Sequence, residues 1–171
     1  FRPGKSGHAY EKIWNKALNE SPLKTITRAQ SAKLGGRLAS LPQVIVDWGM
    51  RYGLPPTPDR IQALKDQGCD RILLFPLYPQ YSAATTATAL DKAYDALKTM
   101  RWQPAIRTVP PYFDHSAHIE ALADSLESHL KSLGWTPDLI LASFHGRPKS
   151  YFMAGDPYHC QCQKTARLVS E

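Results

Sequence analysis

Apolar residues gather in short continuous runs along much of the chain. A run of four to eight apolar residues between polar or turn residues is typical of a strand buried on both faces. Such runs predict strands at Gln43–Gly49, Arg71–Leu77, Ala105–Val109 and Leu139–Ala142. The β-branched residues of Leu23–Thr27 predict a further short strand. The strand at Leu139–Ala142 ends abruptly in Ser143–Pro148, where proline cannot continue it.

Between the runs, apolar residues recur every three or four positions, which is the spacing of a helix that covers a core. Thr57–Asp59 provides a cap, a proline and an acid, as helix starts do, and Gly68 provides a stop. Asp114 is the expected cap of the clearest helix, which Gly134 ends. The predicted helices are Ser6–Leu18, Arg28–Leu41, Thr57 to Gly68, about Ala83 to Met100, Asp114 to Gly134, and Tyr158–Val169.

Alternating strands and helices predict βαβ units. We therefore expect an α/β fold with an open, mainly parallel sheet and helices on both faces, a doubly wound arrangement. The 171 residues are enough for one domain with a substantial core.

Composition narrows the class of protein. With 43% hydrophobic and 21% charged residues, the chain is an ordinary globular one. It has no apolar run long enough for a membrane span and no apolar leader, and its three cysteines argue against a disulfide framework. We expect a cytoplasmic protein.

The net charge of +6 favours acidic partners such as anionic lipid, nucleic acid or a carboxylate-bearing ligand. On charge alone, a solvated basic surface with no particular partner is the better explanation. No run of lysines and arginines supports nucleic-acid binding, and no glycine-rich phosphate loop supports a nucleotide site.

The main candidate for chemistry is His145, in the sequence Ser143-Phe144-His145-Gly146-Arg147-Pro148. Ligands bind at the carboxyl ends of strands in open α/β sheets, which puts His145 at the mouth of a pocket. An imidazole there accepts a proton or ligates a metal. The alternative is a histidine satisfied by hydrogen bonds at a strand end, and position alone does not separate the two.

This segment, followed by Gly155-Asp156-Pro157-Tyr158 and Cys160-Gln161-Cys162, resembles the active-site segment of bacterial ferrochelatases. That family inserts ferrous iron into protoporphyrin IX to make protohaem. The resemblance implies that His145 is the catalytic residue at the porphyrin centre, as the base that accepts pyrrole protons or as a metal ligand; the sequence leaves both roles open.

Two further stretches are similar to the family. Gly49–Gly53 resembles its arginine–tyrosine pair, and Phe75–Ser82 resembles its segment with the letters YPQYS. The resemblance implies porphyrin contacts from six residues: Arg2, Arg51, Tyr52, Tyr81, Ser82 and Phe144. For Arg51 a surface salt bridge is the alternative, and for each aromatic side chain it is core packing.

The resemblance also implies that residues 1–171 form the family's N-terminal α/β domain, which from about residue 138 runs into the crossover to a C-terminal domain. We expect that the chain lacks the family's first strand and its acidic C-terminal half. It would then hold half of the site and, alone, bind porphyrin poorly and insert no metal.

The implied partners are protoporphyrin IX and Fe²⁺ as substrates, with peripheral contact at the inner membrane and no nucleic acid. No tightly bound cofactor is expected. An iron–sulfur cluster is not expected either, because Ala83 stands where some members have a cysteine ligand. Two alternatives remain: a chelatase that inserts cobalt or nickel into another tetrapyrrole, and a non-catalytic porphyrin-binding protein.

Overall fold

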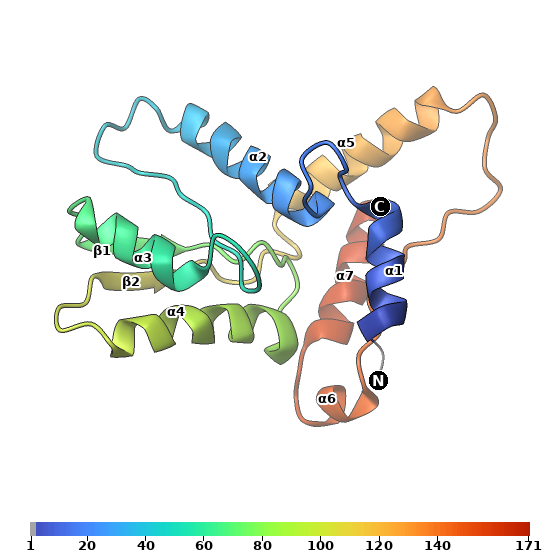
Figure 1. Cartoon of the computed structure of the whole chain (residues 1–171). Helices are drawn as coiled ribbons and strands as arrows, with labels where there is room; N and C mark the ends of the chain where they lie inside the picture. The colour runs from blue at the N-terminus through green and yellow to red at the C-terminus, as the bar shows by residue number, and fades with distance from the viewer. Residues whose placement is uncertain (1–2) are drawn as a thin grey trace. The chain divides into compact units, whose positions relative to one another are not determined.

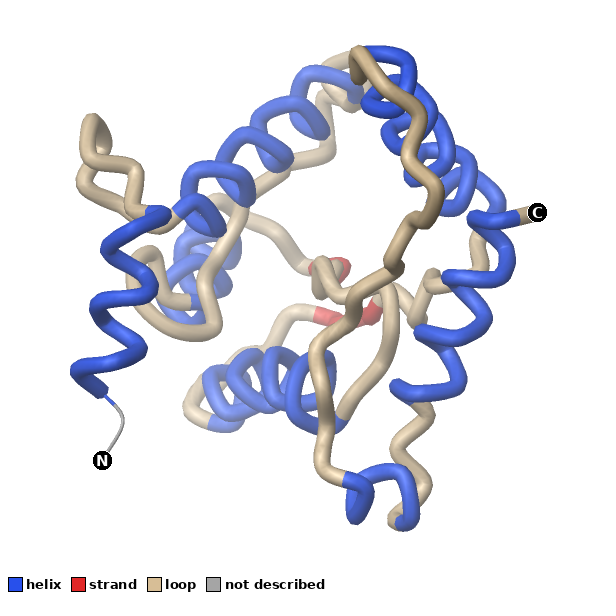
Figure 2. Tube along the Cα trace, turned by 90° about the vertical axis from the view of Figure 1, so that its right-hand side faces the viewer, coloured by secondary structure: helices blue, strands red, loops and turns tan. Residues whose placement is uncertain are grey.

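Helices form most of the regular structure in residues 3–171, the part of the chain that the computed structural model describes (Figure 1). The helices are α1 (Pro3–Ile13), α2 (Pro22–Arg37), α3 (Thr57–Asp66), the five-residue π-helix η1 (Ala83–Ala87), α4 (Thr88–Lys98), α5 (Ser116–Ser132), α6 (Lys149–Met153) and α7 (Tyr158–Ser170). The strands are β1 (Arg71–Leu74) and β2 (Ala105–Thr108). Figure 2 shows how small the share of strand is.

The two strands pair in parallel, with Arg71 opposite Ala105 and Leu74 opposite Thr108. A further backbone hydrogen bond, from Val109 N to Leu74 O at 2.9 Å, extends the pairing by one residue. Parallel pairing needs a crossover between the strands, which η1 and α4 provide. The predicted α/β class with a parallel sheet is therefore confirmed.

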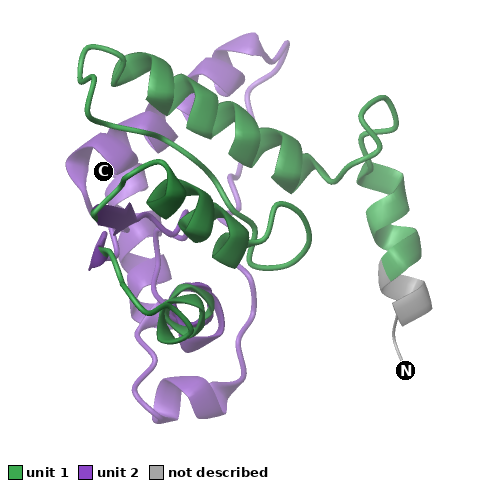
Figure 3. Ribbon diagram, turned by 60° about the vertical axis from the view of Figure 1, so that its left-hand side comes forward, with its two compact units in different colours: residues 1–70, 92–104 green, residues 71–91, 105–171 purple. Residues whose placement is uncertain are grey.

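The chain divides into two compact units that interleave in sequence (Figure 3). The first comprises residues 1–70 and 92–104, and the second comprises residues 71–91 and 105–171. The second unit contains the sheet, η1, α5, α6 and α7, with contacts between α5 and α7. The prediction of one N-terminal domain that enters a crossover near residue 138 is not tested by this division and stays a prediction.

Local signals explain the helices that were predicted correctly. In α3, Ile61 is buried, and Gly68 follows with a φ of +87°, which favours glycine. Ser82 caps η1 by accepting a hydrogen bond from Ala84 N at 3.2 Å, and α4 then buries Ala93. The predicted cap at Thr57 is wrong, because Pro56 takes that position and the Thr57 hydroxyl donates to Met50 O at 3.2 Å.

The predicted strand at Leu23–Thr27 is wrong, because these residues form the first turns of α2. Ser21 caps that helix by accepting from Lys24 N at 3.2 Å, and Pro22 occupies its first turn. The capping pair outweighs the strand preference of the β-branched residues. The predicted cap at Asp114 is also wrong: His115 takes that position, and the Asp114 carboxylate pairs with Lys164 Nζ at 2.6 Å.

The predicted strands at Gln43–Gly49 and Leu139–Ala142 do not form. Within residues 3–171 neither segment has a partner strand, and a strand without a ladder leaves its backbone groups unpaired. Leu139 and Leu141 are 74% and 81% exposed, where the sequence predicted burial. Nothing in the sequence predicted the short helix α6.

Among the helices of residues 3–171, none has both the length and the apolar character needed to cross a membrane.

Candidate functional site

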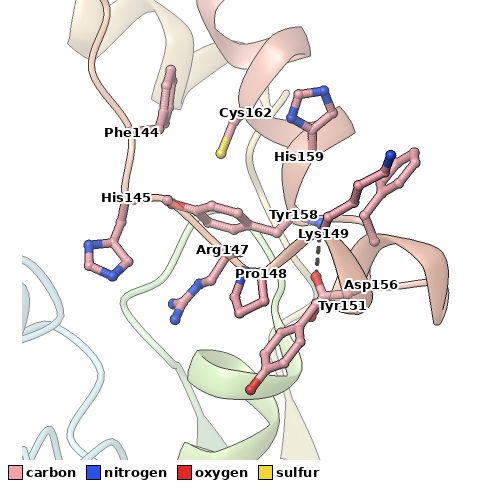
Figure 4. Close-up of a pocket in the computed structure, with 12 residues that line it drawn as sticks. Phe144, His145, Arg147, Pro148, Lys149, Tyr151, Asp156, Tyr158, His159 and Cys162 are labelled. Atoms are coloured by element: carbon pink, nitrogen blue, oxygen red, sulfur yellow. Dashed lines mark hydrogen bonds between the residues drawn. The ribbon is translucent and has the colours of Figure 1, made fainter.

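A pocket of about 480 Å³ lies in the second unit, and all of its lining comes from residues 144–162 (Figure 4). This volume falls in the range of small-molecule sites. The lining comes from the loop of residues 144–148, from α6, from Asp156 and from the start of α7. Of the residues that the sequence proposed for the site, Phe144 and His145, which are neighbours in the sequence, line this pocket.

His145 is exposed and lies on irregular chain between α5 and α6. The prediction that a strand end presents it is wrong in this respect, because Leu139–Ala142 is not a strand here. In Figure 4 the imidazole projects from one side of the backbone, while the Tyr158 ring approaches the backbone of His145 from the other. An exposed imidazole exchanges protons with water directly, which suits a general base.

Arg147 brings positive charge to the pocket beside His145. Its guanidinium carbon lies 5.4 Å from the centre of the Tyr158 ring, a cation–π arrangement. The Nε atom of Arg147 is buried and has no hydrogen-bond partner among the described residues. A cation held against aromatic walls suits a flat ligand that carries carboxylates.

Tyr158 and Cys162 lie on the inner face of α7 and are in contact. Burial, followed by the neighbouring Cys162 thiol, raises the pKa of the Tyr158 hydroxyl, and the backbone of His145 acts in the opposite direction. Burial also raises the pKa of the Cys162 thiol. Both groups therefore stay protonated at neutral pH and act as neutral hydrogen-bonding groups.

Asp156 carries the negative charge of the pocket. Burial opposes its ionisation, but hydrogen bonds from the backbones of Ala83 and Tyr158 and from the Ser82 hydroxyl, with the charge of Arg147, outweigh that effect. The pKa of Asp156 therefore lies below its ordinary value, and the carboxylate is charged at neutral pH.

Tyr81 and Ser82, both predicted to contact porphyrin, lie in the same unit as the pocket. The Tyr81 backbone N–H donates to Gln161 Oε1 at 2.6 Å. Ser82 is 0% exposed, and its hydroxyl donates to Asp156 Oδ2 at 2.9 Å. The Ser82 hydroxyl is thus buried and already hydrogen-bonded within the protein. In this arrangement it is not exposed to a substrate.

Arg51 and Tyr52 belong to the first unit. The guanidinium carbon of Arg51 lies 4.3 Å from the centre of the Tyr52 ring, and Tyr52 is 70% exposed. The adjoining loop closes through a hydrogen bond from Met50 N to Pro55 O at 2.7 Å. The pair thus presents a cation and an aromatic face together, and its contact with a ligand stays a prediction. The remaining predicted contact, Arg2, lies outside the described residues.

The three cysteines are free thiols: Cys69 is half-buried, Cys160 is exposed and Cys162 is buried. Between residues 3 and 171 no group of three or more His, Cys, Asp or Glu side chains is arranged to hold a metal ion. The prediction that no iron–sulfur cluster is bound is not tested by this structure.

Sequence reasoning missed the roles of Arg147, Asp156 and Tyr158. All three belong to motifs that were recognised, but no chemistry was assigned to them. The available signal was local: an acid followed by proline and an aromatic residue at the start of a helix, after a glycine turn. Ser82 and Ala83, the partners of Asp156, lie 74 and 73 residues away in sequence, so spacing alone could not identify them.

Comparison with known proteins gives a consistent result. The family model for ferrochelatase matches residues 1–171. The chain is 64% identical over 170 residues to a ferrochelatase of Rhizobium meliloti (strain 1021), which covers 99% of this chain and 50% of that protein. It is 62% identical to a ferrochelatase of Allorhizobium ampelinum, with 99% and 49% covered, and 55% identical to one of Brucella anthropi, with 98% and 48% covered. The chain thus spans about half the length of the curated relatives it matches.

Proposed function

This chain belongs to the ferrochelatase family, and from that premise we propose that its protein inserts Fe²⁺ into protoporphyrin IX to form protohaem, as a lyase of haem biosynthesis. The observation that carries the proposal is the pocket of about 480 Å³ that places His145 beside aromatic side chains and the Arg147 cation. A porphyrin is a flat apolar disc with anionic propionates at one edge, so it needs such walls and a cation.

Metal insertion requires two pyrrole N–H protons to leave while iron approaches the ring nitrogens. Holding the ring bent exposes the nitrogen lone pairs, so an enzyme that binds the bent ring favours the transition state over the ground state. His145 accepts a pyrrole proton as general base and passes it to water, since the side chain is exposed. The reaction balances as porphyrin plus Fe²⁺ giving haem plus two protons.

The remaining site residues are also proposals. Phe144 supplies an aromatic wall of the pocket, and Arg51 with Tyr52 supplies a cation and a ring for a porphyrin edge. Tyr81 contributes a further aromatic side chain. Metal ligation by His145 is the alternative to proton acceptance, and Fe²⁺ enters as substrate. No resident cofactor is proposed.

For the protein's location we propose the cytoplasm, with peripheral contact at the inner membrane. Helix α6, next to the pocket, exposes Phe152 (47%) and Met153 (72%) and begins with Lys149. Apolar side chains flanked by a cation suit the boundary between headgroups and acyl chains of anionic lipid. Such contact would let an apolar substrate enter the pocket from the membrane.

The test uses the full-length gene product that contains residues 1–171. Porphyrin and Fe²⁺ are added to the wild type and to His145→Ala. We expect the variant to bind porphyrin but to lose about 10²- to 10⁴-fold in insertion rate, the usual contribution of general acid–base catalysis. His129→Ala, which removes an exposed histidine on α5, is the matched control.

Absorption spectra separate the candidate functions. Conversion of the free-base spectrum to a metalloporphyrin spectrum with Fe²⁺ supports a ferrochelatase. Conversion only with Co²⁺ or Ni²⁺ supports another chelatase, and a bound but unmetallated spectrum supports a porphyrin-binding protein. Near-normal insertion of iron by His145→Ala would remove the imidazole from the mechanism.

A further inference from the structure

The start of α7 contacts two loops that are far from each other in sequence. Gly155 turns the chain with a φ of +91°, a conformation that favours glycine, and Asp156 and Tyr158 follow directly. The Asp156 side chain is directed to the loop at Tyr81–Ala83, and the Tyr158 hydroxyl is directed to the loop that carries His145. One helical turn therefore holds two parts of the candidate site.

On the first side, Asp156 uses both carboxylate oxygens. Oδ2 accepts from the Ser82 hydroxyl and from Ala83 N, each at 2.9 Å, while Oδ1 accepts from Tyr158 N at 3.0 Å. Because Ser82 is 0% exposed, water cannot replace the carboxylate as its partner. Gln161, one turn along α7, adds the bond from Tyr81 N at 2.6 Å.

On the second side, the Tyr158 ring lies between the loop and the helix. The guanidinium carbon of Arg147, two residues after His145, lies 5.4 Å from the centre of the ring, and the Tyr158 hydroxyl lies close to the backbone of His145. Figure 4 shows the hydroxyl pointing at the backbone next to His145, opposite the side from which the imidazole projects. Tyr158 thus touches the backbone of the catalytic candidate and leaves its imidazole free for substrate.

We propose that Asp156 and Tyr158 are positioning residues, which hold the loop bearing His145 in fixed register with the Tyr81–Ser82 loop across the start of α7. This inference rests on the proposed function and deepens it. It assigns Ser82 to the support of the site, because its hydroxyl donates to Asp156 Oδ2 and accepts from Ala84 N.

Register matters because a general base acts only within hydrogen-bond reach of the proton it removes. Displacement of a catalytic group by about 1 Å can cost on the order of 100-fold in rate. Helix α7 is a suitable support, because Thr165, further along it, donates a bond of 2.8 Å to Phe113 O and anchors the helix within the unit.

The first test needs no activity. Hydrogen exchange of backbone amides is measured in the substrate-free, full-length gene product for wild type, Tyr158→Phe and Asp156→Asn. We expect faster exchange at residues 143–147 in Tyr158→Phe and at residues 81–84 in Asp156→Asn. Tyr94→Phe, on α4, is the matched control and should change neither. Unchanged exchange at both loops in both variants would overturn the proposal.

The second test is kinetic. Tyr158→Phe keeps the ring below Arg147 and removes only the hydroxyl, so the pocket wall stays in place. We expect kcat for iron insertion to fall about 10- to 100-fold with KM for porphyrin nearly unchanged, because only the alignment of His145 is lost. A rise in KM with kcat intact would instead make Tyr158 a binding residue and reject positioning.

The two tests distinguish a failure of the proposed function from a failure of the positioning role. If the wild type inserts no metal but the loops loosen as predicted, the proposed function fails and the positioning role stands. If the wild type inserts iron and both variants match it in exchange and in kcat, the positioning role fails and the proposed function stands.

Discussion

The segment before His145 and the segment after it differ in the exposure of their side chains and in their hydrogen bonds. Leu139, Ile140 and Leu141 are 74%, 51% and 81% exposed and belong to no sheet within residues 3–171. After His145, the chain reaches Asp156, whose carboxylate accepts three hydrogen bonds. The comparison teaches that the loop of His145 is fixed from its carboxyl side by polar contacts and not from its amino side by apolar packing.

Among the changes that test this comparison, Asp156→Ala is expected to lower the free energy of unfolding most. The change leaves the fully buried Ser82 hydroxyl without its acceptor, and removing a charged acceptor of buried groups costs about 2–3 kcal/mol. The free energy of unfolding, measured by urea denaturation, checks the loss. A loss below about 0.5 kcal/mol, the size of an ordinary surface change, would show that the carboxyl side of the loop is no better held than the amino side.

Protonation of the same carboxylate should have a smaller effect, because a carboxylic acid still accepts one hydrogen bond. The pKa of Asp156 is lowered in the folded protein, so its contribution to stability is complete above the unfolded value, about 3.9. That contribution is lost as the pH falls through the folded pKa. Comparison of wild type with Asp156→Ala between pH 7 and pH 3 should show their stabilities converging in acid; parallel curves would contradict the assignment.

Gln161→Ala should cost about 1 kcal/mol, the usual net value of one hydrogen bond, because Tyr81 N loses its acceptor. Exchange of the Tyr81 amide should rise, while amides near His145 keep their protection. Gln67→Ala, which removes an exposed side-chain bond to Ala63 O, is the matched control and should have less effect on stability. Equal losses of unfolding free energy from both variants would mean that the bond from Tyr81 N to Gln161 stabilises the fold no more than an exposed hydrogen bond does.

The smallest effect is expected from Leu141→Ser. An 81% exposed leucine removes little surface from water, so the free energy of unfolding of this chain should change by less than about 0.5 kcal/mol. Ile72→Ala in β1, where the side chain is 7% exposed, should cost about 2–5 kcal/mol and is the contrasting control. Comparable losses at both positions would show that Leu141 is covered in solution.

Local chemistry decided how far the sequence could predict this fold. Helices α3, α4 and α7 were predicted from signals that act within a few residues: apolar spacing, the Gly68 stop after α3 and the Ser82 cap before η1 and α4. At Leu23–Thr27 the β-branched residues suggested a strand, but the nearby Ser21 cap began a helix. Leu139–Ala142 failed for another reason: a strand depends on a partner, and apolar character alone does not supply one.

The candidate site was predictable to a similar degree. Motif resemblance singled out His145 and Phe144, and the structure places both on one pocket. It also singled out Ser82, but not the buried position of that residue, which depends on Asp156, 74 residues further along the chain. Contacts across that separation follow from the packing of α7 and leave no periodic trace in the sequence.

The two thiols of α7 differ in accessibility: Cys160 is exposed, whereas Cys162 is buried beneath Tyr158. A maleimide dye should therefore react at Cys160 well before it reaches Cys162. Attached there, a fluorophore would sit on the helix that supports the pocket without occupying the pocket itself. Cys160 is thus a native handle with which energy transfer could test the proposed binding of porphyrin.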